Sequence, residues 1–201
     1  TVVTAKIQNA AVTTAKLADD GVTTAKIADA NITTGKLASS LDLSGKTVTY
    51  GLTDSDMPSG SVLQVVTATD QTQRSTTSTS YVTASNTLTV NITPISTSSK
   101  ILVLVSTIGG HSTGGGKVAY FTIFRGSTDL GSTGGNGNGL SQNYGGSSDV
   151  RTSMNMNILD SPSTTSQITY QVYIKDDGSS GQVDINWNSS KGTITAMEIG
   201  G

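Results

Sequence analysis

The sequence predicts a mainly β protein in two parts: a repetitive shaft that needs three chains, followed by an antiparallel β-sandwich. Three observations carry this prediction. The chain opens with four gapless blocks of ten residues, and its later part holds eight short runs typical of strands. The composition is poor in apolar (34%) and charged (13%) residues, which suits short strands joined by turns. We expect a repeat shaft over 1–40, a connector over 41–60 and a jelly-roll-like sandwich over 61–201.

The shaft prediction rests on the blocks TVVTAKIQNA, AVTTAKLADD, GVTTAKIADA and NITTGKLASS. Lys6, Lys16, Lys26 and Lys36 share one position, and Lys46 keeps this phase. The large apolar residues stand five apart, which rotates them about 140° beyond one full turn of a helix. In a strand the same spacing alternates between faces. We therefore expect a composite unit, in which the Thr pair caps a short helical turn.

Two large apolar residues per block cannot form a core within one chain. They can form one around an axis that three chains share, with Lys, Thr and Asp facing water. The side chains that we expect at this axis are Val12, Leu17, Val22, Ile27, Ile32 and Leu37. The alternative is a flexible low-complexity linker, which would not require apolar residues at fixed positions.

The run VTTAKLADDGVTTAKIADANITTGKLA resembles the shaft repeats of bacteriophage tail fibres. The following LDLSGKTVTYGL resembles the neck that precedes a fibre tip, and GTITAMEIGG is similar to the ends of tip domains. This resemblance implies a homotrimeric virion component that is joined to upstream fibre or tail proteins. It also implies adsorption to a bacterial surface glycan or outer-membrane protein. The chain begins at Thr1 inside a repeat, so we interpret it as part of a longer protein or a processed product.

The sandwich prediction rests on runs with period-two alternation, in which one face is apolar and the other polar. Met154 and Met156 alternate with Asn155 and Asn157, for example. The run 101–105 is apolar on both faces, which predicts a central strand with its second face against a neighbouring protomer. The strands expected are 61–69, 87–93, 100–108, 117–125, 151–159, 167–175, 182–188 and 193–199, with a further short strand considered near 80–83.

Charge and composition exclude several partners. The formal net charge is −2 without a basic cluster, so we expect no nucleic acid. Cysteine is absent, which removes disulfides and thiolate metal sites. No apolar run approaches the roughly 20 residues that cross a bilayer, so we expect no membrane insertion. We expect no cofactor and no bound metal.

We also expect no catalytic residues and no enzyme activity. His111, the only histidine, stands beside Gly109 and Gly110, which predicts a loop position at the surface or an interface. A nucleophile elbow of the G-x-S-x-G type is absent. The segment 176–181 (DDGSSG) indicates a hairpin turn rather than a Ca²⁺ site. We interpret the remaining acidic residues of the strands as strand-end or surface groups, namely Asp129, Asp149, Asp160, Asp184 and Glu198. Glu198 would need a cationic partner if it were buried.

The long segment 127–149 is the candidate for recognition, because long loops in compact domains are often functional. It combines an aromatic face with side-chain amides, the groups that a sugar needs for stacking and for hydrogen bonds to its hydroxyls. The receptor-binding residues that we expect are Tyr144, Asn136, Asn138, Gln142 and Asn143, with His111 as a further sugar contact. We expect Trp187 in the core or an interface. Alternatives remain open: a purely structural fibre segment, and a depolymerase of surface polysaccharide.

Overall fold

The computed structural model describes residues 57–112, 117–131, 138–145, 149–178 and 181–201, together with Val12, Thr13, Ala15, Leu17 and Thr23. The chain separates into two units, Thr1–Gly51 and Leu52–Gly201. In the first unit, Val12 and Leu17 are 56% and 47% exposed. Val22, Ile27, Ile32 and Leu37 lie outside the described residues, so the trimeric shaft stays a prediction.

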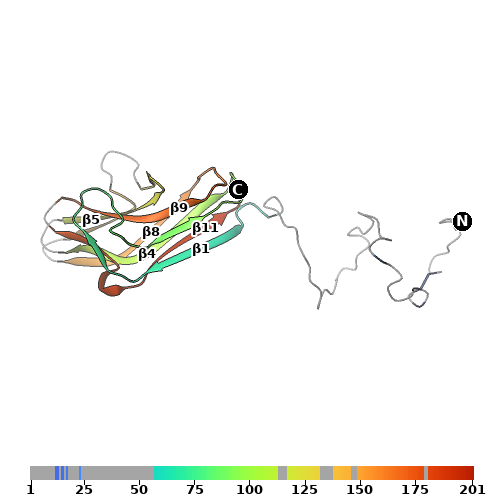
Figure 1. Cartoon of the computed structure of the whole chain (residues 1–201), viewed down its shortest axis with the longest axis horizontal. Coiled ribbons are helices and arrows are strands. Elements are labelled where there is room, and N and C mark those ends of the chain that lie inside the picture. The colour runs from blue at the N-terminus through green and yellow to red at the C-terminus, as the bar shows by residue number, and fades with distance from the viewer. Residues whose placement is uncertain are drawn as a thin grey trace. The chain divides into compact units, whose positions relative to one another are not determined.

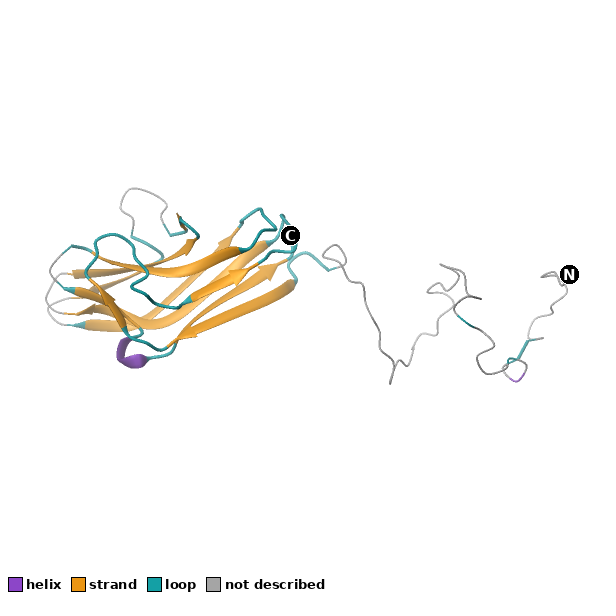
Figure 2. Cartoon of the chain, in the orientation of Figure 1, coloured by secondary structure: helices purple, strands orange, loops and turns teal. Residues whose placement is uncertain are grey.

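The second unit is a sandwich of two antiparallel sheets, seen as two layers of strands in Figures 1 and 2. The first sheet, sheet A, consists of β1 (Val62–Asp70), β2 (Arg74–Thr76), β4 (Lys100–Ser112), β8 (Val150–Asp160), β10 (Gln182–Ile185) and β11 (Gly192–Ile199). The second, sheet B, consists of β3 (Thr89–Ile92), β5 (Lys117–Arg125), β6 (Thr128–Asp129), β7 (Ser141–Gly145) and β9 (Ile168–Asp176). The mainly β, antiparallel class is therefore as predicted.

The strand order is that of a jelly roll. Four strands of sheet A run in the order β1-β11-β4-β8, and four strands of sheet B run in the order β3-β9-β5-β7. Eight strands in two sheets, each with partners far away in the sequence, give the double Greek-key arrangement. The short β10 and β2 extend sheet A beside the end of β4.

The core lies between the sheets and is formed by the inward side chains of the alternating strands. Ile101, Val103 and Val105 on β4 face Phe121 and Ile123 on β5, and all five are buried. Burying each such side chain contributes about 1.5–3 kcal/mol. β4 is the central strand, as its apolar run predicted, with β8 along one edge and β11 and β10 along the other.

Several sequence-based predictions are wrong at the level of single elements. The segment 127–149 is not one long loop, because it contains β6 and β7, which both pair with β5. The strand expected over 182–188 ends at Ile185, since Asn186 is left-handed (φ 55°) and starts the short 3-10 helix η6 (Trp187–Ser189). Trp187 is half-buried under the guanidinium of Arg151, 3.5 Å from the ring centroid, and not in the core, so only its expected place in an interface stays a prediction.

Three of the five acidic residues interpreted as strand-end or surface groups are buried, although Asp160 does end its strand. Asp184 is fully buried and accepts hydrogen bonds from Arg151, and Asp160 is 9% exposed and accepts two from Arg125. Glu198 is fully buried, and among the described residues it has no ion pair with the cation that we expected. Its carboxylate instead accepts hydrogen bonds from the Gln64 amide and from the backbone N–H of Ile95. Neutral donors thus satisfy a buried carboxylate here.

Candidate functional site

The residues predicted for recognition fall into two groups, because β7 alternates like any strand. Gln142 and Tyr144 point outward and are exposed, Tyr144 by 65%. Asn143 points inward, is 7% exposed, and donates a hydrogen bond to the Thr152 hydroxyl on β8. Asn143 is therefore a packing residue, which corrects its assignment to the recognition set. Asn138 is exposed, and Asn136 lies outside the described residues.

Gln142 and Tyr144 belong to a larger outward surface of sheet B, which we call the tyrosine face. It consists of Tyr81, Tyr120, Gln142, Tyr144 and Lys175. Gln142 stands opposite Tyr120, which in turn stands opposite Lys175 on β9. The Lys175 ammonium lies 4.6 Å from the Tyr81 ring centroid and 4.9 Å from that of Tyr120. The face thus combines aromatic rings, an amide and a cation held by cation–π contacts.

Two further aromatic contacts support the tyrosine face. Phe124 stacks on Tyr173 at 4.1 Å and meets the Tyr81 ring edge-on at 6.0 Å. Burial raises the pKa of Tyr81, and the negative charge of Asp129 raises it further, so its hydroxyl keeps its proton. Beside this face, a hollow of about 290 Å³ is lined by Asn138, Gly139, Leu140, Ser141 and Gln142.

The outward surface of sheet A has a different chemistry. Across β1, β11, β4 and β8, one cross-strand row consists of Val65, Met197, Leu102 and Leu159. Leu104 stands in the next row, and Val62 is the first residue of β1. Val62, Val65 and Leu159 are 51–53% exposed and Leu104 is 37% exposed. We call these six residues the aliphatic face. Large apolar side chains gathered on one exposed surface are typical of an interaction site.

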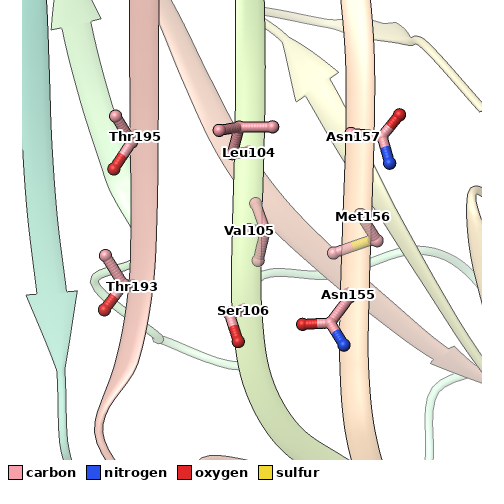
Figure 3. A pocket seen from close by; sticks show the side chains of 8 residues that line it. All are labelled: Leu104, Val105, Ser106, Asn155, Met156, Asn157, Thr193 and Thr195. Atoms are coloured by element: carbon pink, nitrogen blue, oxygen red, sulfur yellow. The ribbon is translucent and has the colours of Figure 1, made fainter.

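The aliphatic face grades into polar rows toward the other end of the strands. Figure 3 shows this region, where Thr193 and Thr195 on β11, Leu104 and Ser106 on β4, and Asn155 and Asn157 on β8 lie side by side. They line a shallow hollow of about 350 Å³. The row of Val65 and the two rows beyond it carry no charged side chain on these four strands.

His111 is not in a loop. It lies in β4, is 2% exposed, and its Nε2 is 2.9 Å from Oδ1 of Asp176 at the end of β9. The prediction of a loop, which rested on the neighbouring Gly109 and Gly110, is wrong because both glycines also lie in β4. A Cβ at Gly109 would stand 2.7 Å from the Asp184 carbonyl oxygen and 2.9 Å from the Phe121 ring, so glycine is needed there for close packing within a strand. His111 is thereby removed from the surface where a sugar would bind.

Three of the buried carboxylates are held in separate pairs. Asp160 is bound by Arg125, Asp184 by Arg151, and Asp176 by His111. Burial raises the pKa of Asp184, and the hydrogen bonds and charge of Arg151 act in the opposite direction. Each pair joins different strands, and the Arg125 and His111 pairs join the two sheets.

No helix in the described part of the chain is long and apolar enough to span a membrane.

Comparisons with known proteins give fold likeness only. No family model and no curated protein matches the chain. Among solved structures, it is similar to chains of infectious bursal disease virus. For the T=1 particle the TM-score is 0.40 at 17% identity, over 83% of this chain and 44% of that one. For the VP2 subviral particle the TM-score is 0.36 at 16% identity, over 83% of this chain and 46% of that one.

A third solved structure, the T13 particle of the same virus, gives a TM-score of 0.37 at 16% identity, over 70% of this chain and 36% of that one. This chain therefore spans less than half the length of these particle proteins. The topology and the two outward faces define the class of domain more closely: a jelly-roll sandwich with one aliphatic and one aromatic outer surface.

Proposed function

We propose that this chain is the distal part of a viral fibre, in which three copies associate and the sandwich forms an adhesive tip for a bacterial surface. The observation that carries the proposal is the aliphatic face. Exposed Val62, Val65 and Leu159 would cost free energy in an isolated soluble domain, because apolar side chains favour removal from water. A neighbouring copy of the same domain would cover them.

The repeat segment supports this choice of partner. Its blocks carry too few apolar residues for a single-chain core, and Val12 and Leu17 are exposed in one chain. The chain leaves the repeats and enters the sandwich at β1, where Val62 and Val65 begin the aliphatic face. Three chains associated through their repeats would therefore hold three copies of the sandwich at a high effective concentration.

The tyrosine face is the adhesive surface in this proposal. It lies on the sheet opposite the aliphatic face, so association through sheet A leaves it open to solvent. Tyr144 offers an exposed ring for stacking on the C–H face of a sugar, while Gln142 and Asn138 offer hydrogen bonds to hydroxyls. Three linked tips turn weak single sites into useful adhesion through effective concentration. The proposed activity is binding, without cleavage of the glycan.

The association is tested with Leu159→Asp, which places a charge on each copy of the aliphatic face. Light scattering of the parent chain is expected to give three times the chain mass of 20.5 kDa. The variant is expected to lose association of the sandwich, and a matched Thr165→Asp variant in an exposed loop should remain trimeric. A monomeric parent chain, or an unchanged Leu159→Asp trimer, would contradict the proposal.

The adhesion is tested with purified surface polysaccharide of host cells. A binding tip retains the intact polymer, a structural segment ignores it, and a depolymerase releases reducing or unsaturated ends. We expect retention without such products. Release of reducing or unsaturated ends would show that the chain is a depolymerase. If neither the polysaccharide nor whole cells retain the chain, only the structural role would be left.

A further inference from the structure

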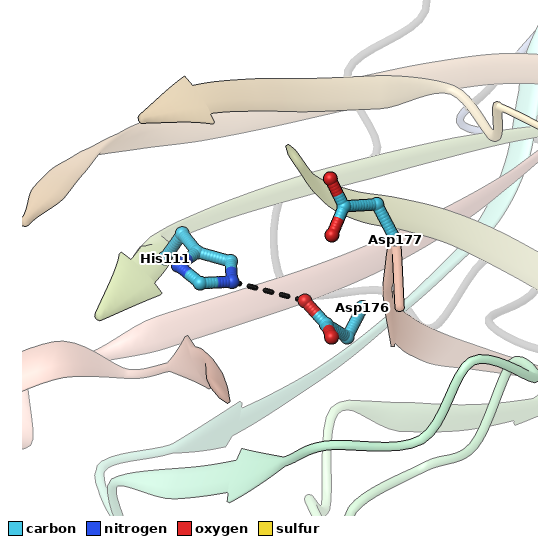
Figure 4. A group of neighbouring side chains, drawn as sticks. All are labelled: His111, Asp176 and Asp177. Atoms are coloured by element: carbon cyan, nitrogen blue, oxygen red, sulfur yellow. Dashed lines mark hydrogen bonds and ion pairs between the residues drawn. The ribbon is translucent and has the colours of Figure 1, made fainter. Parts of the chain in front are cut away.

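We propose that His111, Asp176 and Asp177 form a binding site for a divalent transition-metal ion such as Zn²⁺ at one end of the sandwich. One ligand atom from each residue, a ring nitrogen or a carboxylate oxygen, lies within 4.8 Å of the other two. Figure 4 shows the imidazole of His111 opposite the Asp176 carboxylate, with the Asp177 carboxylate beside them. This site is independent of the proposed adhesive function.

The donor set selects the class of metal. One imidazole nitrogen with two carboxylates suits Zn²⁺, Mn²⁺, Fe²⁺ or Co²⁺, whereas Ca²⁺ and Mg²⁺ prefer oxygen ligands alone. Two carboxylates also balance the charge of a divalent ion when the imidazole is neutral. Three protein ligands leave a position for water, as in an open zinc site.

The ligands are held in place before an ion arrives. His111 and Asp176 are 2% and 3% exposed, so strand packing fixes both side chains. Oδ2 of Asp176 accepts a hydrogen bond from the Gly178 backbone N–H at 3.2 Å, and Oδ2 of Asp177 accepts one from Val118 at 2.9 Å. Such partners outside the ligand set orient metal ligands and tune their affinity.

The backbone around His111 is shaped to admit the imidazole edge. A Cβ at Gly181 would collide with Cε1 of His111, so only glycine allows this close approach. Gly178 has a φ of 95°, a left-handed conformation that turns the chain directly after the two aspartates. The end of β9 and the turn after it therefore place the two carboxylates near the ring of His111, which precedes Asp176 by 65 positions.

Binding changes the protonation of the ring without further chemistry. Nε2 of His111 now lies at hydrogen-bond distance from Asp176, so it must be free of its proton to bind a metal. In a neutral ring the proton moves to Nδ1, and in a protonated ring one proton leaves to solvent. The carboxylate oxygen that met this proton becomes a metal ligand. The ion thus replaces the hydrogen bond as the link between β4 and β9.

The test uses the whole chain, prepared without a histidine tag and freed of metal with EDTA. Calorimetric titration with Zn²⁺ is expected to show one ion per chain, and Co²⁺ should produce the visible absorption of a bound ion. Asp177→Asn keeps the buried His111–Asp176 contact and should fold normally. We expect this variant to weaken Zn²⁺ binding at least tenfold, because the loss of even a hydrogen-bond partner outside the ligand set weakens metal binding by about 10–100-fold.

The matched control is Asp149→Asn, which removes a half-exposed carboxylate that pairs with Arg151 outside the cluster. It should bind Zn²⁺ like the parent chain. His111→Gln should abolish the Co²⁺ absorption, with the circular dichroism spectrum reporting whether the sheets remain. If the three residues only link the two sheets, the chain will show no saturable Zn²⁺ binding at micromolar concentrations, or Asp177→Asn will leave the binding unchanged. Either result overturns the proposal.

Discussion

One carboxylate joins the two sheets near the start of β4, and its partners can be removed one at a time. Asp160 ends β8 in sheet A and is 9% exposed. Its oxygens accept hydrogen bonds from Nη1 of Arg125 on β5, both at 2.8 Å, and from the Tyr170 hydroxyl on β9 at 2.6 Å. Burial raises the pKa of Tyr170, and the hydrogen bond to Asp160 raises it further, so the phenol remains a donor.

The expected cost of Tyr170→Phe follows from this geometry. The ring is fully buried, so phenylalanine fills the same space and only the hydroxyl is lost. A hydrogen bond to a charged group contributes about 1.5–3 kcal/mol, and Asp160 keeps Arg125 as its counter-ion. Arg125→Met leaves the buried carboxylate without a cation, which costs about 3–5 kcal/mol in a fully buried pair. Because Arg125 is 28% exposed, we expect Arg125→Met to lower the free energy of unfolding by less than this range. The loss should still be at least as large as that of Tyr170→Phe.

The assay is urea unfolding followed by the fluorescence of Trp187, the only tryptophan. Protein concentration is held constant, because association of folded chains also stabilises them. The control is Tyr173→Phe, which removes a hydroxyl on the outward side of β9 and keeps the stacking on Phe124. An unchanged free energy of unfolding in Tyr170→Phe, or an equal loss in Tyr173→Phe, would refute the role assigned to Asp160.

Two further predictions concern acid stability and adhesion. Burial alone would raise the pKa of Asp70, but hydrogen bonds from the Thr87 and Thr72 amides and the charge of Arg74 outweigh it, so the pKa lies below 3.8. The stabilisation from Asp70 is therefore present at pH values above the pKa of this group in the unfolded chain, and it is lost as the pH falls through the lowered pKa of the folded state. Asp70→Asn should reduce the dependence of the free energy of unfolding on pH in this acidic range. An unchanged pH dependence would contradict the role of Asp70. Tyr144→Ala should reduce adsorption to host cells severalfold while the melting temperature stays within a degree or so, since an exposed substitution changes stability by about 0.5 kcal/mol or less. Full adsorption by this variant would move the adhesive site away from the tyrosine face.

Local alternation determined much of the sandwich in advance. The period of two is a property of the strand itself, so the sequence predicted the strand Lys117–Arg125 at both ends and the central place of β4. The same rule failed where no apolar alternation exists. Ser141–Gly145 (SQNYG) is a strand because the edge of β5 offers it backbone partners, and its own side chains give no such signal.

The candidate sites depended more strongly on tertiary contacts. Sequence reasoning selected Tyr144 and Gln142 by their chemistry, and both lie on the surface, although their role in recognition stays a prediction. It also placed Asn143 beside them, although neighbouring residues of a strand face opposite ways. It also missed Tyr81, Tyr120 and Lys175, which come from three distant segments. Tyr120 meets Lys175 because β5 and β9 pair in one register, and Tyr81 meets it because Val82 forms a bridge with Ile174.

The sequence by itself determined the ten-residue blocks of the repeat segment, the β class and the apolar side of the strands that alternate. These properties follow from spacing along the chain. Tertiary structure alone decided which strands become neighbours, and therefore that Val65, Met197 and Leu159 share one exposed row while His111 meets Asp176 in the interior. Strand order in a jelly roll is set by long-range pairing and close packing, to which local periodicity does not contribute.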